Sequence, residues 1–237
     1  MNPAGNCIDD GALPGEENMA RDQALLERAV RGEGPFLRVY GWARPTLSLG
    51  YFQKLEEVAV PGAPERLGVD VVRRFTGGGA ILHHREVTFA VAVPAAHPWA
   101  ALDVQGSYLE ITRPLLTLLN GRMVAARYRG ECGGGAKTAN CFAGAAFTDV
   151  VVRGRKLFGS AQRRREGAIL QHGSLLLDVD QDLWDGVFGP QVGSGYIGLS
   201  EIGAKLTELD WGAELKKAYK IALGGSLARQ SLGPLNA

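Results

Sequence analysis

Cysteine and methionine are scarce in this chain, with three of each among 237 residues. Cys7, Cys132 and Cys141 are too few and too irregularly spaced to form a disulfide framework. A reducing cytoplasm fits this count, because thiols stay free there for chemistry. There is no CxxC motif and no pair of histidines at helical spacing, so we expect no metal site.

An excess of charge and long apolar runs are also missing. The formal net charge is +1, which argues against nucleic acid as the main partner, although Arg163, Arg164 and Arg165 form a local basic cluster. No apolar run approaches the ~20 residues that a membrane span needs, and no stretch reads as a signal peptide. We therefore expect a cytoplasmic protein, a monomer, with no membrane or nucleic-acid partner.

The composition is that of an ordinary globular protein, with 46% apolar and 22% charged residues. Residues 1–15 are rich in Gly, Pro and Asn, and we expect them to form a disordered tail. Residues 16–237 show no internal repeat and no linker, which predicts one domain. Apolar residues at helical spacing predict helices from Glu17 to about Gly32, over 106–120 and over 211–223, with a short helix over 181–188.

Strand-like runs cover 36–41, 46–50, 69–75, 147–153 and 168–178. Residues 79–82 and 87–93 are expected to pair as two strands joined by a turn from His83 to Glu86. The Gly-rich stretches 129–140 and 190–200 are expected to be loops. Strands covered by a few helices predict a mixed α+β domain.

The richest signal is a pair of stretches that combine glycines, basic residues and apolar runs, at residues 73–84 and 153–173. Glycine lets backbone N–H groups approach a ligand closely, and a neighbouring cation can hold a carboxylate, a phosphate or a polarised carbonyl. We expect the two stretches to form opposite walls of one pocket. The triple glycine Gly77–Gly79 fits no standard nucleotide-binding motif.

Individual residues in or near these stretches allow two interpretations each. Cys141 is either a small buried residue or a nucleophile, and Cys132 and Cys7 are weaker candidates. Lys156 is either a surface lysine or a cation placed at a developing oxyanion. His83 and His172 are more often structural hydrogen-bonding groups than bases, and their sequence spacing does not decide between these roles.

Several motifs in this order resemble the family of lipoate–protein ligases, octanoyltransferases and biotin–protein ligases, from about Asn18 to Ala222. Asn18-Met-Ala-Arg-Asp-Gln-Ala-Leu is similar to the family's first helix, and Pro45-Thr-Leu-Ser-Leu-Gly-Tyr-Phe-Gln to its P-x-x-x-x-G-x-x-Q turn. Arg73-Arg-Phe-Thr-Gly-Gly-Gly-Ala-Ile-Leu-His resembles the R-R-x-[ST]-G-G-[GR]-A-V-x-H signature. Gly154-Arg-Lys-Leu-Phe-Gly-Ser-Ala resembles the G-x-K-x-x-G-[ST]-A segment, whose lysine contacts the acyl carbonyl.

Further details resemble the octanoyltransferase branch first known from Gram-positive bacteria. Glu86-Val-Thr-Phe is similar to its E-[LV]-T-[YF], Cys141-Phe142 to its catalytic Cys-Phe, and Gln171-His-Gly-Ser to its Q-H-G-S. Gly79 departs from the arginine often found there in this branch and is more like the ligases.

The resemblance implies a single α+β mixed-sheet domain of the class II aminoacyl-tRNA synthetase and biotin ligase catalytic fold. It implies transfer of an octanoyl group from octanoyl-acyl carrier protein to Cys141, and then to a lysine of a lipoyl domain or of glycine cleavage H protein, in lipoate biosynthesis. Lys156 would bind the acyl carbonyl, and no cofactor would be required. The implied acyl-binding residues are Arg74, Gly77, Gly78, Gly79, His83, Gly159, Ser160, Ala161, Gln162, His172 and Gly173.

Two other functions stay open. An ATP-dependent lipoate–protein ligase would need ATP and Mg²⁺, and usually an accessory domain, for which we expect no room after the last helix. A non-catalytic lipoyl-domain-binding module would not need both Cys141 and Lys156.

Overall fold

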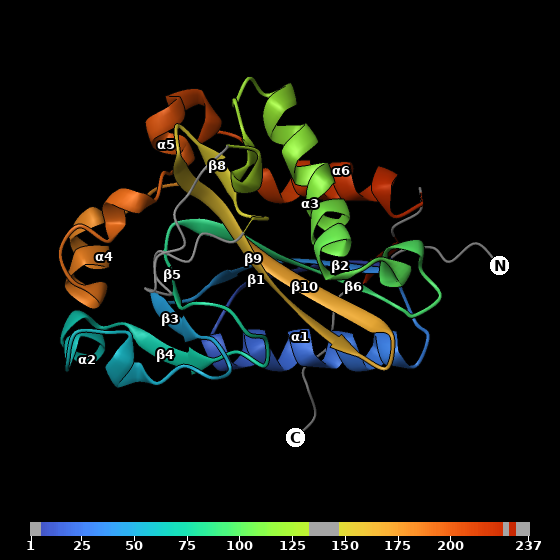
Figure 1. Ribbon diagram of the computed structural model, residues 1–237, viewed down its shortest axis with the longest axis horizontal. Helices are drawn as coiled ribbons and strands as arrows, with labels where there is room; N and C mark the ends of the chain where they lie inside the picture. The colour runs from blue at the N-terminus through green and yellow to red at the C-terminus, as the bar shows by residue number, and fades with distance from the viewer. Residues whose placement is uncertain (1–5, 133–146, 225–227, 231–237) are drawn as a thin grey trace.

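The computed structural model describes residues 6–132, 147–224 and 228–230. Its strands form one large and one small sheet, with helices on both faces of the large one (Figure 1). In chain order the helices and strands are β1 (Asn6–Leu13), α1 (Gly15–Val30), β2 (Phe36–Trp42), β3 (Thr46–Leu49), η1 (Leu55–Glu57), α2 (Ala63–Leu67), β4 (Asp70–Arg73), β5 (Ile81–His83), β6 (Glu86–Val93), η2 (Pro98–Ala101), α3 (Val104–Gly121), β7 (Arg127–Tyr128), η3 (Arg129–Cys132), β8 (Val150–Val152), β9 (Arg155–Arg165), β10 (Ala168–Leu176), α4 (Gln181–Phe188), η4 (Gly193–Gly195), α5 (Leu199–Ile202), η5 (Ala204–Leu206), α6 (Trp211–Ala222) and β11 (Ala228–Gln230).

The large sheet has the strand order β11-β1-β2-β6-β10-β9-β8-β7. β1 pairs in parallel with β11 and β2, whereas the remaining neighbours in this sheet are antiparallel. The small sheet has the order β4-β3-β5, with β3 parallel to β4 and antiparallel to β5. The predicted mixed-sheet α+β architecture is therefore confirmed.

Two apolar layers hold helices against the large sheet (Figure 1). On one face, α3 and α6 pack over residues from β2, β6, β8 and β9, with Leu37, Phe89, Leu115 and Leu215 fully or almost fully buried. On the other face, α1 packs over β6 and β10 through Leu25, Leu26 and Ala29. The small sheet has its own core with α4, centred on Leu47, Leu82 and Trp184.

Most of the predicted elements are present. The helices expected from Glu17, over 106–120, over 181–188 and over 211–223 correspond to α1, α3, α4 and α6. The predicted tail is wrong for Asn6–Leu13, which form β1, because that segment pairs in parallel with both β2 and β11. The assignment of 16–237 as one domain stays a prediction.

Some local predictions were also wrong. The strands near 79–82 and 87–93 do not pair with each other: β5 pairs with β3, and β6 lies between β2 and β10. The stretch 190–200, expected to be a loop, includes the short helix η4 and the start of α5. None of the helices in the described ranges is long and apolar enough to cross a membrane.

The packing of α3 gives a test of the fold. Leu115 is fully buried under the large sheet, whereas Ile221 on α6 is 83% exposed. Leu115→Ala should lower the free energy of unfolding by about 2–5 kcal/mol, because the cavity it leaves cannot be filled. Ile221→Ala should change it by less than about 0.5 kcal/mol. Urea unfolding of both variants measures the difference, and equal effects would contradict this placement of α3.

Candidate active site

A cavity of about 580 Å³ lies between the large sheet and the glycine-rich segment that follows β4. Its floor comes from strands β2, β6, β9 and β10, and residues 191–196 close one side. Both glycine-rich stretches identified in the sequence line it. Of the residues predicted to form the site, those that line the cavity are Arg74, Gly78, Gly79, His83, Lys156, Gly159, Ser160, Ala161, His172 and Gly173.

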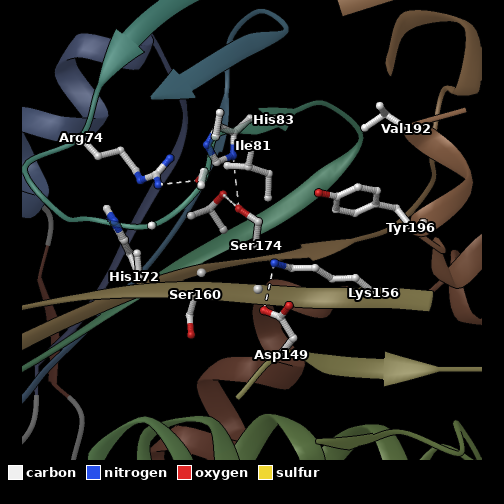
Figure 2. A pocket seen from close by; sticks show the side chains of 18 of the residues that line it. Arg74, Ile81, His83, Asp149, Lys156, Ser160, His172, Ser174, Val192 and Tyr196 are labelled. Atoms are coloured by element: carbon white, nitrogen blue, oxygen red, sulfur yellow. Dashed lines mark hydrogen bonds and ion pairs between the residues drawn. The ribbon is translucent and has the colours of Figure 1, made fainter. Parts of the chain in front are cut away.

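Three predicted site residues are not among those that line the cavity. Cys141 lies outside the described residues. Gly77 does not line the cavity, and its carbonyl accepts a hydrogen bond from Arg74 instead. Gln162 faces α3, where it bonds to Ser107, because alternate residues of a strand face opposite sides of the sheet. Ser160 borders the cavity, but its side chain points away from it, and its Oγ accepts from Gln171 (Figure 2).

The guanidinium of Arg74 holds residues 77–79, the glycine wall of the cavity, in place. It donates to the carbonyls of Ser48, Gly77 and Gly79, at 2.8, 3.1 and 2.9 Å. Burial lowers the pKa of Arg74 to about 10, so that it remains a cation at neutral pH. Arg74 therefore holds the glycine segment in its folded position through hydrogen bonds. This structural role comes in addition to the ligand contact that the resemblance implies.

One hydrogen-bonded relay runs from Arg74 towards α1. Arg74 Nε donates to Thr76 Oγ1, which lies 2.9 Å from His172 Nε2, and His172 Nδ1 lies 2.8 Å from Asp22 Oδ2. Asp22 is fully buried and also accepts from Arg38 and Tyr40. Burial alone would raise the pKa of Asp22, but the Arg38 cation and the His172 hydrogen bond outweigh it and hold the pKa below its ordinary value.

A second relay leaves the same guanidinium. Arg74 Nη1 donates to Ser48 Oγ at 2.7 Å, Ser48 Oγ lies 2.7 Å from His83 Nε2, and His83 Nδ1 lies 2.8 Å from Glu86 Oε1. The His83 ring stacks on Trp42 with a centroid distance of 3.8 Å. Burial lowers the pKa of His83 more strongly than Glu86 raises it, so that the imidazole is neutral at pH 7.

The donor character of Arg74 fixes part of these relays. Because Arg74 can only donate, Ser48 and Thr76 accept from it. His83 is neutral and its Nδ1 faces the Glu86 carboxylate, so that Nδ1 carries the proton and Nε2 accepts from the Ser48 hydroxyl. In this arrangement His83 is a structural group, which is the first of the two interpretations that the sequence allowed.

On its other side, the glycine wall packs closely against the backbone of the turn that begins at Gly50. A Cβ atom on Gly50 would lie only 2.0 Å from the carbonyl oxygen of Gly78. Arg73 Nη1 donates to the Gly50 and Tyr51 carbonyls at 3.2 Å, and this clamps the turn against the wall. Gly50 was not among the predicted site residues, although the P-x-x-x-x-G-x-x-Q turn contained it. Gly78 has φ +92°, so that any side chain there strains the backbone regardless of the pocket.

Lys156 lies in the cavity and is not an ordinary surface lysine. Its Nζ lies 2.9 Å from Asp149 Oδ1, and Figure 2 shows the side chain running along β9 towards this carboxylate. A Cβ on Gly159 would lie 2.2 Å from the Lys156 ε-carbon. Because Gly159 has no side chain, the end of the Lys156 side chain can occupy the space above Gly159 on the same strand. Asp149 was missed by the sequence analysis, because a lone aspartate before a strand carries no motif of its own.

Solved lipoate–protein ligases share this arrangement of sheets and helices. A crystal structure of lipoate-protein ligase A bound with ATP superposes with a TM-score of 0.78 at 21% identity, covering 97% of this chain and 90% of that one. A bipartite lipoate protein ligase of Thermoplasma acidophilum gives 0.71 at 19% identity, with 97% and 88% covered. These likenesses define the fold, that of a lipoate–protein ligase catalytic domain.

The sequence assigns the family. Residues 14–212 match the lipoyl protein ligase A/B catalytic domain, and the chain belongs to this family. Among its relatives are octanoyltransferases LipM. That of Carboxydothermus hydrogenoformans is 44% identical over 180 residues, covering 74% of this chain and 65% of its own length. That of Staphylococcus aureus is 40% identical over 194 residues, covering 77% and 69%. The chain thus matches about two thirds of the length of these relatives.

The neutral, buried His83 predicts how stability depends on pH. In the folded state the pKa of His83 is lowered from its ordinary value of 6.5. Below about pH 6.5, His83 therefore binds a proton in the unfolded chain but stays neutral in the folded chain. This contribution is therefore present above pH 6.5 and is lost as the pH falls, by up to about 1.4 kcal/mol per pH unit. The free energy of unfolding, measured by urea at pH 7.5, 6.5 and 5.5, should fall more steeply for the wild type than for His83→Gln. Parallel curves would contradict a neutral His83.

Proposed function

We propose that this protein transfers an octanoyl group from octanoyl-acyl carrier protein to a lysine of a lipoyl domain or of glycine cleavage H protein, as a step of lipoate biosynthesis. The relatives named octanoyltransferase LipM support the reaction. The observation that carries the proposal is Lys156, whose ammonium is held inside the cavity between two glycine-lined walls. A fixed cation in this position can stabilise the oxyanion of acyl transfer.

The reaction would proceed in two acyl transfers. The Cys141 thiolate attacks the carbonyl carbon of the donor thioester, a new C–S bond forms, and the donor thiolate leaves and takes up a proton. The amine of the acceptor lysine then attacks the Cys141 thioester, loses a proton as the amide forms, and releases Cys141. Each attack passes through a tetrahedral oxyanion, next to which the Lys156 ammonium would lie. No ATP is consumed, because the incoming thioester is already activated.

The position of Cys141 in the chain is compatible with this role. The structure does not describe residues 133–146, but Gly130 and Phe147, just outside that range, are joined by a backbone hydrogen bond of 3.0 Å. Arg129 and Asp149, their neighbours, line the cavity. Six peptide units link Cys141 to Phe147, a reach of at most about 20 Å. This length of chain is compatible with a Cys141 that acts at the cavity.

The cavity also offers room for an acyl chain. Met19, Ala80 and Ile81 provide apolar lining beside the polar end at Lys156. The seven methylene and methyl carbons of an octanoyl group would contribute about 5–6 kcal/mol if fully buried, at ~0.8 kcal/mol each. An eight-carbon acyl chain is thus the proposed substrate. The cytoplasmic location and the absence of a required cofactor remain predictions.

Gly79 supports one alternative function. Because glycine at this position is more like the ligases, an ATP-dependent lipoate–protein ligase is the second candidate. Its adenylate would use the same cavity, since Lys156 can hold a phosphate oxygen as well as a carbonyl oxygen. The third possibility, a binding module without catalysis, has less support, because a binder needs no ammonium held inside the cavity.

The first functional prediction concerns the covalent intermediate. Wild-type protein mixed with octanoyl-acyl carrier protein, without ATP, should gain the mass of one octanoyl group. Cys141→Ala should gain none, and its transfer rate should fall by many powers of ten because the nucleophile is gone. Intact-protein mass spectrometry measures the adduct. Adduct formation by Cys141→Ala would exclude Cys141, and lipoate transfer that occurs only with ATP would establish the ligase.

The second functional prediction uses the space above Gly159. Gly159→Ala places a methyl group where the Lys156 side chain now lies, and only the flexible end of that lysine has to move. We expect acyl transfer to fall by about 10²-fold or more with little change in melting temperature. Gly195→Ala is the matched control, because Gly195 also lines the cavity and a Cβ there meets no atom within 4 Å. Equal activities of the two variants would show that the position of Lys156 is unimportant.

A further inference from the structure

Asp149 connects two cations, Lys156 on β9 and Arg129 directly after β7. Its Oδ1 lies 2.9 Å from Lys156 Nζ, and its Oδ2 lies 3.8 Å from Arg129 Nε. The Arg129 backbone N–H donates to the Asp149 carbonyl at 2.8 Å. Arg129 follows β7, Asp149 precedes β8 and Lys156 belongs to β9, so that the cluster crosses three neighbouring strands. The carboxylate side chain is only 5% exposed, whereas the two cations are 24% and 28% exposed and line the cavity.

The charges around the cavity do not cancel at this cluster. Asp149 is the one carboxylate among the described residues that line the cavity, and it faces two cations. Arg74, the third cation, is bound by carbonyls and hydroxyls of the glycine wall. The buried histidines end on their own carboxylates. Within the cluster itself, Lys156, Arg129 and Asp149 together carry a net charge of +1.

An excess of one positive charge suits a group that is neutral when it binds and gains one negative charge in the transition state. A thioester carbonyl is such a group. Arg129 has an Nε–H that is buried and has no hydrogen-bond partner. Such a donor is costly to leave unpaired. This Nε lies 3.8 Å from Asp149 Oδ2, and Arg129 lines the cavity, so that its other guanidinium N–H groups would be the ones to contact a bound acyl group.

We propose that Asp149 is a positioning residue, which holds the Lys156 ammonium and the Arg129 guanidinium side by side, and that Arg129 is a second cation for the acyl carbonyl oxygen. This inference rests on the proposed acyl transfer. Without the carboxylate the two cations would repel each other, and the four-carbon stem of Lys156 would lose its fixed geometry. The acyl oxygen would then meet one mobile cation in place of two fixed ones.

The test of Asp149 is a double-mutant cycle with Lys156, read as single-turnover formation of the octanoyl adduct. Asp149→Asn should lower the maximal rate by about 10–100-fold with little change in the half-saturating donor concentration, because the interaction is made only in the transition state. Asp149→Glu should restore part of the rate. In a Lys156→Gln background, Asp149→Asn should have a much smaller effect. Equal effects of Asp149→Asn in the two backgrounds, or a normal rate in the single variant, would overturn the positioning role.

Arg129 is tested against a neighbour of the same type. Arg129→Gln should lower the maximal rate by about 10-fold or more, and Arg129→Lys should retain part of it. Arg127→Gln, which removes an exposed arginine that does not line the cavity, should leave the rate unchanged. Equal rates for Arg129→Gln and Arg127→Gln would overturn the role of Arg129. If the wild type itself forms no adduct, the proposed acyl transfer fails; if it does and these variants match it, only the present inference fails.

Discussion

The site depends on one buried cation, the guanidinium of Arg74. It is bound by three backbone carbonyls and two hydroxyls, and each hydroxyl continues through a histidine to a carboxylate. The positive charge of Arg74 is thus matched at a distance by Glu86 on β6, and the relay through His172 ends on Asp22 of α1. Because a half-satisfied buried network is costly, these elements can pack only when the glycine segment is in place. The fold and the shape of the cavity are therefore set by the same interactions.

Absent side chains matter as much as the charges that are present. The glycine wall can approach the turn after β3 because Gly50 has no Cβ, and Lys156 can cross its own strand because Gly159 has none. Gly173 likewise leaves space for the ring of Phe158, which a Cβ would approach to 2.3 Å. These glycines are not simply flexible points of the backbone. Each one leaves a defined volume that another group of the protein occupies.

The sequence allowed much of this to be predicted, but not how the residues connect. Helix periodicity located α1, and Asn18 and Asp22 fall on the face that carries Leu25, Leu26 and Ala29, so that a buried carboxylate could have been found from the pattern. The resemblance identified Lys156 and both glycine stretches as parts of one site. Local sequence could not reveal that His172 meets Asp22, 150 residues away, or that β5 and β6 belong to different sheets. Asp149 and Arg129 had no signal, because their roles arise only when three strands lie side by side.

The described part of the cavity suits more than one reaction of the family. A cluster with a net charge of +1 can stabilise the oxyanion of a tetrahedral intermediate, and it can equally hold a phosphate oxygen of an adenylate. The cations therefore suit an anionic oxygen, and they do not distinguish the chemistry that would produce it. That choice depends on whether a thiolate reaches the acyl carbon. In the proposed function, Cys141 is thus the residue that would decide between transferase and ligase activity, while Arg129, Asp149 and Lys156 would provide an electrostatic setting that both reactions share.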